Sequence, residues 1–218
     1  MKSYKFAFLF DRANNWLEIF FKSSKVIKNI FKYNDCQIYY DEREIINNDI
    51  VFILGYTKIL SQNFLEKNRL NVIVHESALP KGKGFSPVQW QILEGENIIP
   101  ICLLEAVTQV DSGDILFQTH FVLNGNELYG EIREKQSVAT INAISEFLKI
   151  YPFFSRKKQS GMDTYYPRRH AKDSELDIKK SIAEQFNLLR VGNNDEWPSF
   201  FFLNDKKYII KIYEDGPI

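Results

Sequence analysis

The sequence that decides the fold reads Val72-Ile-Val-His75-Glu-Ser77-Ala-Leu79-Pro80-Lys-Gly82-Lys-Gly84-Phe-Ser86-Pro87, and it continues to Val110-Asp111-Ser-Gly113-Asp114. An apolar run brings His75 to the point where a strand should end. A glycine-containing loop, a helix and a second apolar strand follow before Asp111. We therefore predict that both side chains lie at the carboxyl edge of a parallel sheet, where open α/β sheets bind ligands. A His beside a carboxylate suits a general base with its orienting group.

Working outward, apolar runs of strand length alternate with segments of helical periodicity. Strands are predicted at 4–10, 36–40, 50–54, 71–75 and 98–104, and helices at 16–31, 61–67, 87–95 and 127–150. This alternation indicates an α/β fold with a mostly parallel, twisted sheet flanked by helices. We expect residues 1–150 to form a catalytic domain. Residues 151–218 should form a short α+β extension, with one helix over 173–190 and strands at 199–203 and 207–213.

The central stretch resembles the formyltransferases that use N10-formyltetrahydrofolate. Their signature is Asn-x-His, Ser-x-Leu-Pro, a glycine-containing loop, a Pro that opens a helix and a later Asp-x-Gly. The matching residues are His75, Ser77-Ala-Leu79-Pro80, Gly84, Pro87 and Asp111-Ser-Gly113, in that order. The resemblance implies a Rossmann-like formyltransferase fold. Ile73 stands where the family has the Asn that donates a hydrogen bond to the developing oxyanion, and Ile has no donor. Asn71, two residues earlier on the same strand face, is expected to lie too far away.

The resemblance also implies roles for individual residues. His75 would be the catalytic base and Asp111 would orient it and help relay protons. The loop after the third strand would contact the folate, largely through its backbone: Leu54, Gly55, Tyr56 and Lys58, together with Asp111. A looser resemblance of the tail to short bacterial sugar N-formyltransferases, added to the position of each side chain, suggests substrate contacts from Asn14, Ser77, Lys81, Trp90, Tyr166, Arg168 and Arg169.

Each of these assignments has a simpler structural alternative. His75 could be an ordinary strand-end His, and Asp111 a turn residue beside Gly113. The Lys81–Gly84 loop could cradle an anion through its amides or be a solvated turn. Trp90 could belong to the core. Asn14 and Trp16 could line a sugar pocket or simply pack at a helix start, and the two arginines could be surface charge.

Composition restricts the class of partner. The chain of 218 residues has 28 basic and 28 acidic side chains, so no basic excess favours bulk nucleic-acid binding. No apolar run reaches the length of a membrane helix, and no cluster has metal-ligand spacing. The two cysteines, Cys36 and Cys102, lie far apart in apolar stretches, as expected of reduced residues in a cytoplasmic protein.

These observations favour an N-formyltransferase that moves a formyl group from N10-formyltetrahydrofolate to the amine of a nucleotide-linked amino sugar, a dTDP- or UDP-linked 4-amino-4,6-dideoxy sugar of O-antigen or related glycan synthesis. Two alternatives remain open. One is another small amine such as glycinamide ribonucleotide, and the other is a folate- or nucleotide-binding homologue that lost activity with the Asn. A Rossmann dehydrogenase is disfavoured because no G-x-G-x-x-G follows the first strand. The apolar tail residues Phe200–Phe202 suggest a homodimer contact.

Overall fold

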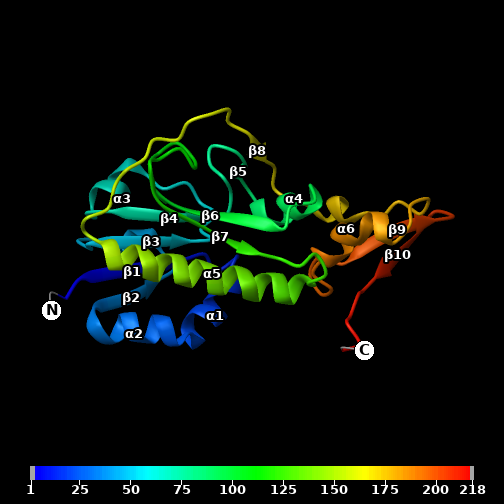
Figure 1. Cartoon of the computed structure of the whole chain (residues 1–218), viewed down its shortest axis with the longest axis horizontal. Helices are drawn as coiled ribbons and strands as arrows, with labels where there is room; N and C mark the ends of the chain where they lie inside the picture. The colour runs from blue at the N-terminus through cyan, green and yellow to red at the C-terminus, as the bar shows by residue number, and fades with distance from the viewer. Residues whose placement is uncertain (1–2, 217–218) are drawn as a thin grey trace.

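The computed structural model describes residues 3–216, which build a six-stranded central sheet and a smaller tail (Figure 1). The strand order is β2-β1-β3-β4-β6-β7. The bounds of these strands are Lys5–Phe10 for β1, Asp35–Tyr39 for β2, Ile50–Leu54 for β3, Asn71–His75 for β4, Ile98–Glu105 for β6 and Ile115–Val122 for β7. The α/β fold predicted from the alternation of strands and helices is thus confirmed.

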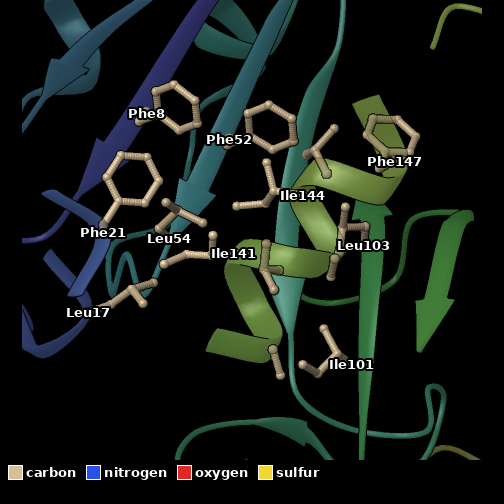
Figure 2. Packing of buried hydrophobic residues seen from close by; sticks show 14 of the residues in the cluster. Phe8, Leu17, Phe21, Phe52, Leu54, Ile101, Leu103, Ile141, Ile144 and Phe147 are labelled. Atoms are coloured by element: carbon tan, nitrogen blue, oxygen red, sulfur yellow. The ribbon is translucent and has the colours of Figure 1, made fainter. Parts of the chain in front are cut away.

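Both faces of the central strands are buried, which explains their continuous apolar sequence. Along β1, Phe6, Phe8 and Phe10 face one core and Ala7 and Leu9 face another. The larger core is covered by helices, whose bounds are Trp16–Ser23 for α1, Lys25–Tyr33 for α2 and Tyr129–Ile150 for α5. Figure 2 shows its centre, where aromatic side chains from the sheet meet Phe147 of α5. The second core is covered by α3 (Gln62–Glu66).

The direction of β6 differs from the prediction. Strands β2, β1, β3 and β4 are parallel, but β6 runs antiparallel to β4, with Val72 opposite Glu105 and His75 opposite Cys102. The prediction that a strand parallel to β4 leads to Asp111 was therefore wrong, although the Asp111 side chain does lie beside His75 at the carboxyl end of β4. Since β6 ends at the opposite edge, the connection 106–114 has to fold back over the sheet to bring Asp111 towards His75.

Two predicted helices are also interrupted. The segment 16–31 forms α1 and α2, because Ser24 adopts an extended conformation between them and its hydroxyl accepts a hydrogen bond from the Ile27 amide. The predicted helix 173–190 is reduced to two 3-10 turns, Ala171–Ser174 and Ala183–Gln185, followed by α6 (Phe186–Arg190). The predicted tail strands are present as β9 (Ser199–Leu203) and β10 (Lys206–Ile210), an antiparallel pair.

Residues 157–166, which we call the strap, cross the face of the sheet opposite α5 (Figure 1). Lys157 pairs with Ile115 at the start of β7. At the other end, β8 (Tyr165–Tyr166) pairs in parallel with β5 (Lys83–Gly84), just ahead of α4 (Pro87–Leu93). The strap therefore lies directly on the loop that follows His75. No helix within residues 3–216 is long and apolar enough to span a membrane.

Candidate active site

His75 ends β4 and is 6% exposed. Its Nε2 lies 2.8 Å from the carbonyl oxygen of Gly82. A carbonyl oxygen only accepts, so Nε2 carries a proton and donates it to this bond. The other nitrogen, Nδ1, faces the Asp111 carboxylate, with 3.7 Å between Nδ1 and Oδ2. The nitrogen that can take up a proton is therefore the one that faces a buried negative group.

Asp111 is held by the backbone around it and less by His75. Its Oδ2 accepts a hydrogen bond from the Gly84 amide at 2.9 Å, and the residue has a left-handed conformation with φ of 49°. Gly113, two residues later, packs against the backbone of Glu105 so closely that a Cβ would lie 1.7 Å from the Glu105 oxygen. This contact explains the Asp-x-Gly pattern, because only glycine lets the loop pass over the end of β6.

The glycine loop after His75 serves the strap and is not an anion cradle. The Gly82 amide donates to the Thr164 hydroxyl at 2.8 Å and the Lys83 amide to the Thr164 oxygen at 2.9 Å. A Cβ on Gly84 would lie 2.5 Å from the Tyr166 oxygen. These amides are taken by protein partners, so they are not free to bind a ligand. Lys81 is exposed and keeps its ammonium group in solvent.

Two residues of this site were not among the predicted ones. The Lys83 side chain is buried, and its ammonium group lies 2.8 Å from Asp163 Oδ2 and 3.2 Å from Ser112 Oγ. The hydrogen bond from Lys83 holds the pKa of Asp163 below its usual value. Gln159 donates from its amide nitrogen to the carbonyl oxygens of Asp111 and Gly113, at 2.8 and 2.9 Å. These partners are distant in sequence, so no local pattern could have indicated them.

The position of the missing family Asn is apolar in space as well as in sequence. Ile73 is half-buried on the face that carries His75, where it packs against the second core and against a small cluster around Leu79 and Cys102. Asn71 donates its amide to the Leu65 oxygen at 2.9 Å and so is not directed to the site. Ser77 is 1% exposed, and its hydroxyl has no hydrogen-bond partner among residues 3–216.

The residues predicted to bind folate lie on a loop that is joined to the end of β1. Leu54 is buried at the end of β3, and Gly55 has φ of 62°. The Asn14 amide donates to the Gly55 oxygen at 2.8 Å. Asp11 accepts from the amide and the hydroxyl of Thr57. Burial alone would raise the pKa of Asp11, but these bonds and that from the Ala13 amide outweigh it and keep the pKa low.

The side chains beyond Gly55 lie at the surface of the same loop. The Tyr56 hydroxyl donates to Glu42, and burial together with this contact raises the pKa of Tyr56. The Lys58 ammonium lies 5.7 Å from the centre of the Tyr56 ring. Asn14 and residues 54–58 are thus brought together at the carboxyl ends of β1 and β3.

Four predicted substrate residues lie on α4 or close to its start: Trp90 belongs to α4, Tyr166 ends the strap, and Arg168 and Arg169 follow it. Trp90 stacks with Tyr166 and donates to the Pro167 oxygen at 2.8 Å. The Tyr166 hydroxyl donates to the Glu94 carboxylate at 2.6 Å. Burial of the hydroxyl, together with this hydrogen bond, raises the pKa of Tyr166. Arg169 lies over Trp90, and burial lowers the pKa of Arg169. Only Arg168 keeps an exposed guanidinium, 4.4 Å from the ring of Phe85.

The segment that carries His75 and Asp111 matches a known protein family. A family model described as formyl transferase matches residues 35–147, a span that contains His75 and Asp111. The chain belongs to the formyl transferase family. The formyl transferase match covers β4, the glycine loop, the strand β6 and most of α5, so the elements that position the two side chains are family elements.

Curated formyl transferase relatives include larger proteins. The chain is 33% identical over 174 residues to methionyl-tRNA formyltransferase of Fervidobacterium nodosum, which covers 78% of this chain and 54% of that protein. It is 30% identical over 170 residues to the bifunctional polymyxin resistance protein ArnA of Wigglesworthia glossinidia brevipalpis, covering 74% of this chain and 25% of that protein. The chain thus spans about half, or less, of the length of these relatives.

Solved structures match nearly the whole chain at low sequence identity, so they show the shared fold. A methionyl-tRNA formyltransferase from Clostridium thermocellum has a TM-score of 0.78 at 20% identity and covers 97% of this chain and 94% of its own. A 4-N formyltransferase from Francisella tularensis has a TM-score of 0.76 at 17% identity, and the match covers 98% of this chain and 99% of that one. HypX from Aquifex aeolicus, solved in complex with tetrahydrofolic acid, has a TM-score of 0.74 at 15% identity, covering 97% and 38%. The Rossmann-like formyltransferase fold predicted from the sequence is confirmed.

The described residues, 3–216, contain no group of three or more His, Cys, Asp or Glu side chains that could hold a metal ion.

Proposed function

We propose that this chain is an N-formyltransferase that moves a formyl group from N10-formyltetrahydrofolate to the amine of a nucleotide-linked amino sugar. The observation that carries the transfer chemistry is the buried pair His75 and Asp111, with Nδ1 facing the carboxylate inside the segment matched by the family. The folate would supply the formyl group. The residues present fit it, since a buried acid–base pair and a polar loop at 54–58 lie at one edge of β3 and β4.

The proton chemistry follows from the tautomer of His75. With Nε2–H bound to Gly82, Nδ1 is free to take the proton from the attacking amine. The resulting imidazolium would face the Asp111 carboxylate 3.7 Å away, and burial strengthens that attraction. We assign His75 as the base and Asp111 as the group that stabilises its charged form. The oxyanion donor is not Asn71, whose amide is bound to Leu65.

The choice of a nucleotide-linked sugar is supported by three observations. The chain has no net charge, which weighs against a tRNA acceptor. A solved sugar N-formyltransferase from Shewanella sp FDAARGOS_354 shares the fold over 99% of its own length. Arg168 offers an exposed cation beside Phe85, in the loop that follows His75. Asn14, Ser77, Lys81, Trp90, Tyr166 and Arg169 stay proposed substrate contacts, although Trp90, Tyr166 and Arg169 now make protein contacts of their own.

We place the enzyme in the cytoplasm, in agreement with its two free thiols. Burial raises the pKa of Cys36 to about 12, so this thiol stays protonated and unreactive.

The test is formyl transfer from N10-formyltetrahydrofolate, followed by mass spectrometry. The acceptor panel holds dTDP- and UDP-linked 4-amino-4,6-dideoxy sugars, 3-amino sugars and glycinamide ribonucleotide. We expect the mass gain of one formyl group on a nucleotide sugar, and a loss of roughly 10²- to 10⁴-fold in kcat for His75→Ala with a large loss for Asp111→Ala. Formylation of glycinamide ribonucleotide alone would contradict the sugar assignment.

A second candidate is favoured by Ile73, which removes the family donor. In that case the chain binds folate or a nucleotide without catalysis. Comparing wild type with Ile73→Asn separates the two. If both fail to formylate every acceptor while tetrahydrofolate binds tightly, the binding protein replaces the enzyme.

A further inference from the structure

Arg133 of α5 is a half-buried cation without a counter-ion. Its guanidinium carbon lies 4.4 Å from the centre of the Trp16 ring and 5.1 Å from that of Tyr129. Its Nη1 donates to the Gln136 side chain at 2.9 Å, and its Nε is buried without a partner. Within residues 3–216 no carboxylate forms an ion pair with Arg133, whereas Arg190 and Arg156 each face one.

Leaving a half-buried guanidinium without a counter-ion costs free energy. Aromatic faces stabilise a guanidinium by only about 0.5–2 kcal/mol, and buried charges in proteins are normally paired. The Nη2 group of Arg133 has no hydrogen-bond partner in the described part of the chain. A guanidinium held between two rings with donors to spare is preorganised for a planar or tetrahedral oxyanion.

The position of Arg133 connects it with the candidate active site. Gln136, which accepts from Arg133, donates its amide to the Glu76 carboxylate at 2.8 Å. Glu76 directly follows His75, and its backbone oxygen accepts from Gln91 at 2.7 Å. Two hydrogen bonds therefore lead from the guanidinium to the residue beside the proposed base. On the other side, Trp16 opens α1 just after Asn14, which binds the Gly55 loop.

We propose that Arg133 forms an anion site for a phosphate group of the acceptor, with Trp16 and Tyr129 as its walls. The site rests on the proposed function, because it would anchor a phosphorylated amine near His75. Gln136, itself bound to Glu76, positions the guanidinium. Other charges nearby are engaged: Lys135 pairs with Glu127 at 2.5 Å, and Glu131 accepts from the Leu128 amide.

Binding of phosphate compounds tests the site without catalysis. Isothermal titration calorimetry of the full chain uses UDP, dTDP, inorganic pyrophosphate and ribose 5-phosphate, so that the arms distinguish a diphosphate from a monoester. Arg133→Met keeps a long side chain and removes the charge. Arg133→Lys keeps the charge and removes the planar guanidinium that can donate two parallel hydrogen bonds. Lys149→Met removes an exposed positive charge from the far end of the same helix and is the matched control.

We expect one of the phosphate compounds to bind wild type and Lys149→Met equally. Arg133→Met should weaken this binding roughly ten- to a hundredfold, the range for a charged hydrogen bond, and Arg133→Lys should fall between. If Arg133→Met binds the phosphate compound as tightly as wild type, with or without a lower Tm, the proposed anion site is wrong. Arg133 would then only stabilise the packing of α1 against α5. The failure of all four compounds to bind wild type would also overturn the site.

The two proposals fail separately. Phosphate binding that depends on Arg133 without formyl transfer to any acceptor would keep the site and remove the enzyme. Formyl transfer that proceeds equally in wild type and Arg133→Met would keep the enzyme and remove the site.

Discussion

His75 and Asp111 show how few direct contacts define the proposed reactive pair. Within residues 3–216 the His75 side chain makes one hydrogen bond, to Gly82, and Asp111 is fixed through Gly84 and through its own carbonyl oxygen. The separation of 3.7 Å between the two side chains is therefore set by their backbones. Gln159 is the residue whose substitution best tests this support, because its amide nitrogen donates to the carbonyl oxygens of both Asp111 and Gly113.

Replacing Gln159 should lower turnover more than binding. In Gln159→Met both hydrogen bonds are lost, and in Gln159→Glu a carboxylate faces two carbonyl oxygens. We expect kcat to fall roughly ten- to a hundredfold, with little change in the KM for folate. The fall should be larger in Gln159→Glu than in Gln159→Met. Steady-state kinetics with the acceptor that the formyl-transfer panel identifies would measure this. Gln62→Met on the surface of α3 is the control, and a kcat equal to wild type in both Gln159 variants would show that Asp111 needs no such support.

His75 and Asp111 lie side by side, as predicted from the sequence, but the strand that leads to Asp111 runs in the direction opposite to the predicted one. The apolar runs predicted the strands, because burial of both faces requires continuous hydrophobic sequence. The direction of β6 is not encoded in such a run, since the connection through α4 is long enough for either direction. The contacts of Lys83 and Gln159 join segments distant in sequence and leave no periodic signal. Their discovery required the folded chain.

Among the elements, the strap is the one on which the site depends. It pairs with β5, caps the Gly82 amide and places Asp163 on the buried Lys83 ammonium. The proposed domain boundary at residue 150 stays a proposal. The contacts of the strap nevertheless give residues 157–166 a structural part in the site around His75 and Asp111.

The buried ammonium of Lys83 makes the strap sensitive to single substitutions. Asp163→Asn leaves Lys83 with Ser112 as its remaining polar partner and should lower the Tm and kcat together. Lys83→Met removes the charge and keeps the volume, so the double variant should recover part of the Tm lost in Asp163→Asn. Thermal unfolding of the four proteins measures the coupling. Additive changes would mean that the ion pair does not hold the strap.

For the whole molecule, Glu127 is one of the residues that connect the sheet with the tail. It accepts from the Asn124 and Gly125 amides and pairs with Lys135, and the buried Arg190 of the tail lies 3.7 Å away. Burial by itself would raise the pKa of Glu127, but the bonds from Lys135 and the two amides lower it to about 2. Burial also lowers the pKa of Arg190.

This lowered pKa predicts acid sensitivity. A carboxyl group with a depressed folded pKa contributes stability above its unfolded pKa and loses it as the pH falls towards the folded value. We expect the free energy of unfolding to drop by about 3 kcal/mol between roughly pH 5 and pH 2 through Glu127 alone. Urea unfolding across this range measures it. Glu127→Gln should be less stable at pH 7 and show a shallower decline, and an unchanged slope would exclude Glu127 as the cause.

The tail hairpin exposes apolar side chains to solvent. Phe202, Leu203 and Ile209 are 48%, 44% and 61% exposed, and an isolated two-stranded hairpin is marginally stable. Lys206 and Lys207 on β10 complement the acidic groups Glu175 and Asp177 beside Phe202. We expect a second copy of the chain to cover this surface. Light scattering should report a dimer, and Ile209→Asp a folded monomer. A monomeric wild type would contradict this assembly.

The strap also sets an order of events during synthesis. Proteins fold from the amino terminus as they leave the ribosome, and every strand of the central sheet precedes the strap in the chain. A nascent chain that has emerged only through α5 can form both cores except for the later residues Tyr151 and Val191 of the larger one, while the loops bearing His75 and Asp111 are not yet fastened. Reactivity would therefore arise as a late step of translation, separate from the gain of structure, and nascent chains stalled before and after residue 166 should differ in activity while sharing the same protease-resistant core.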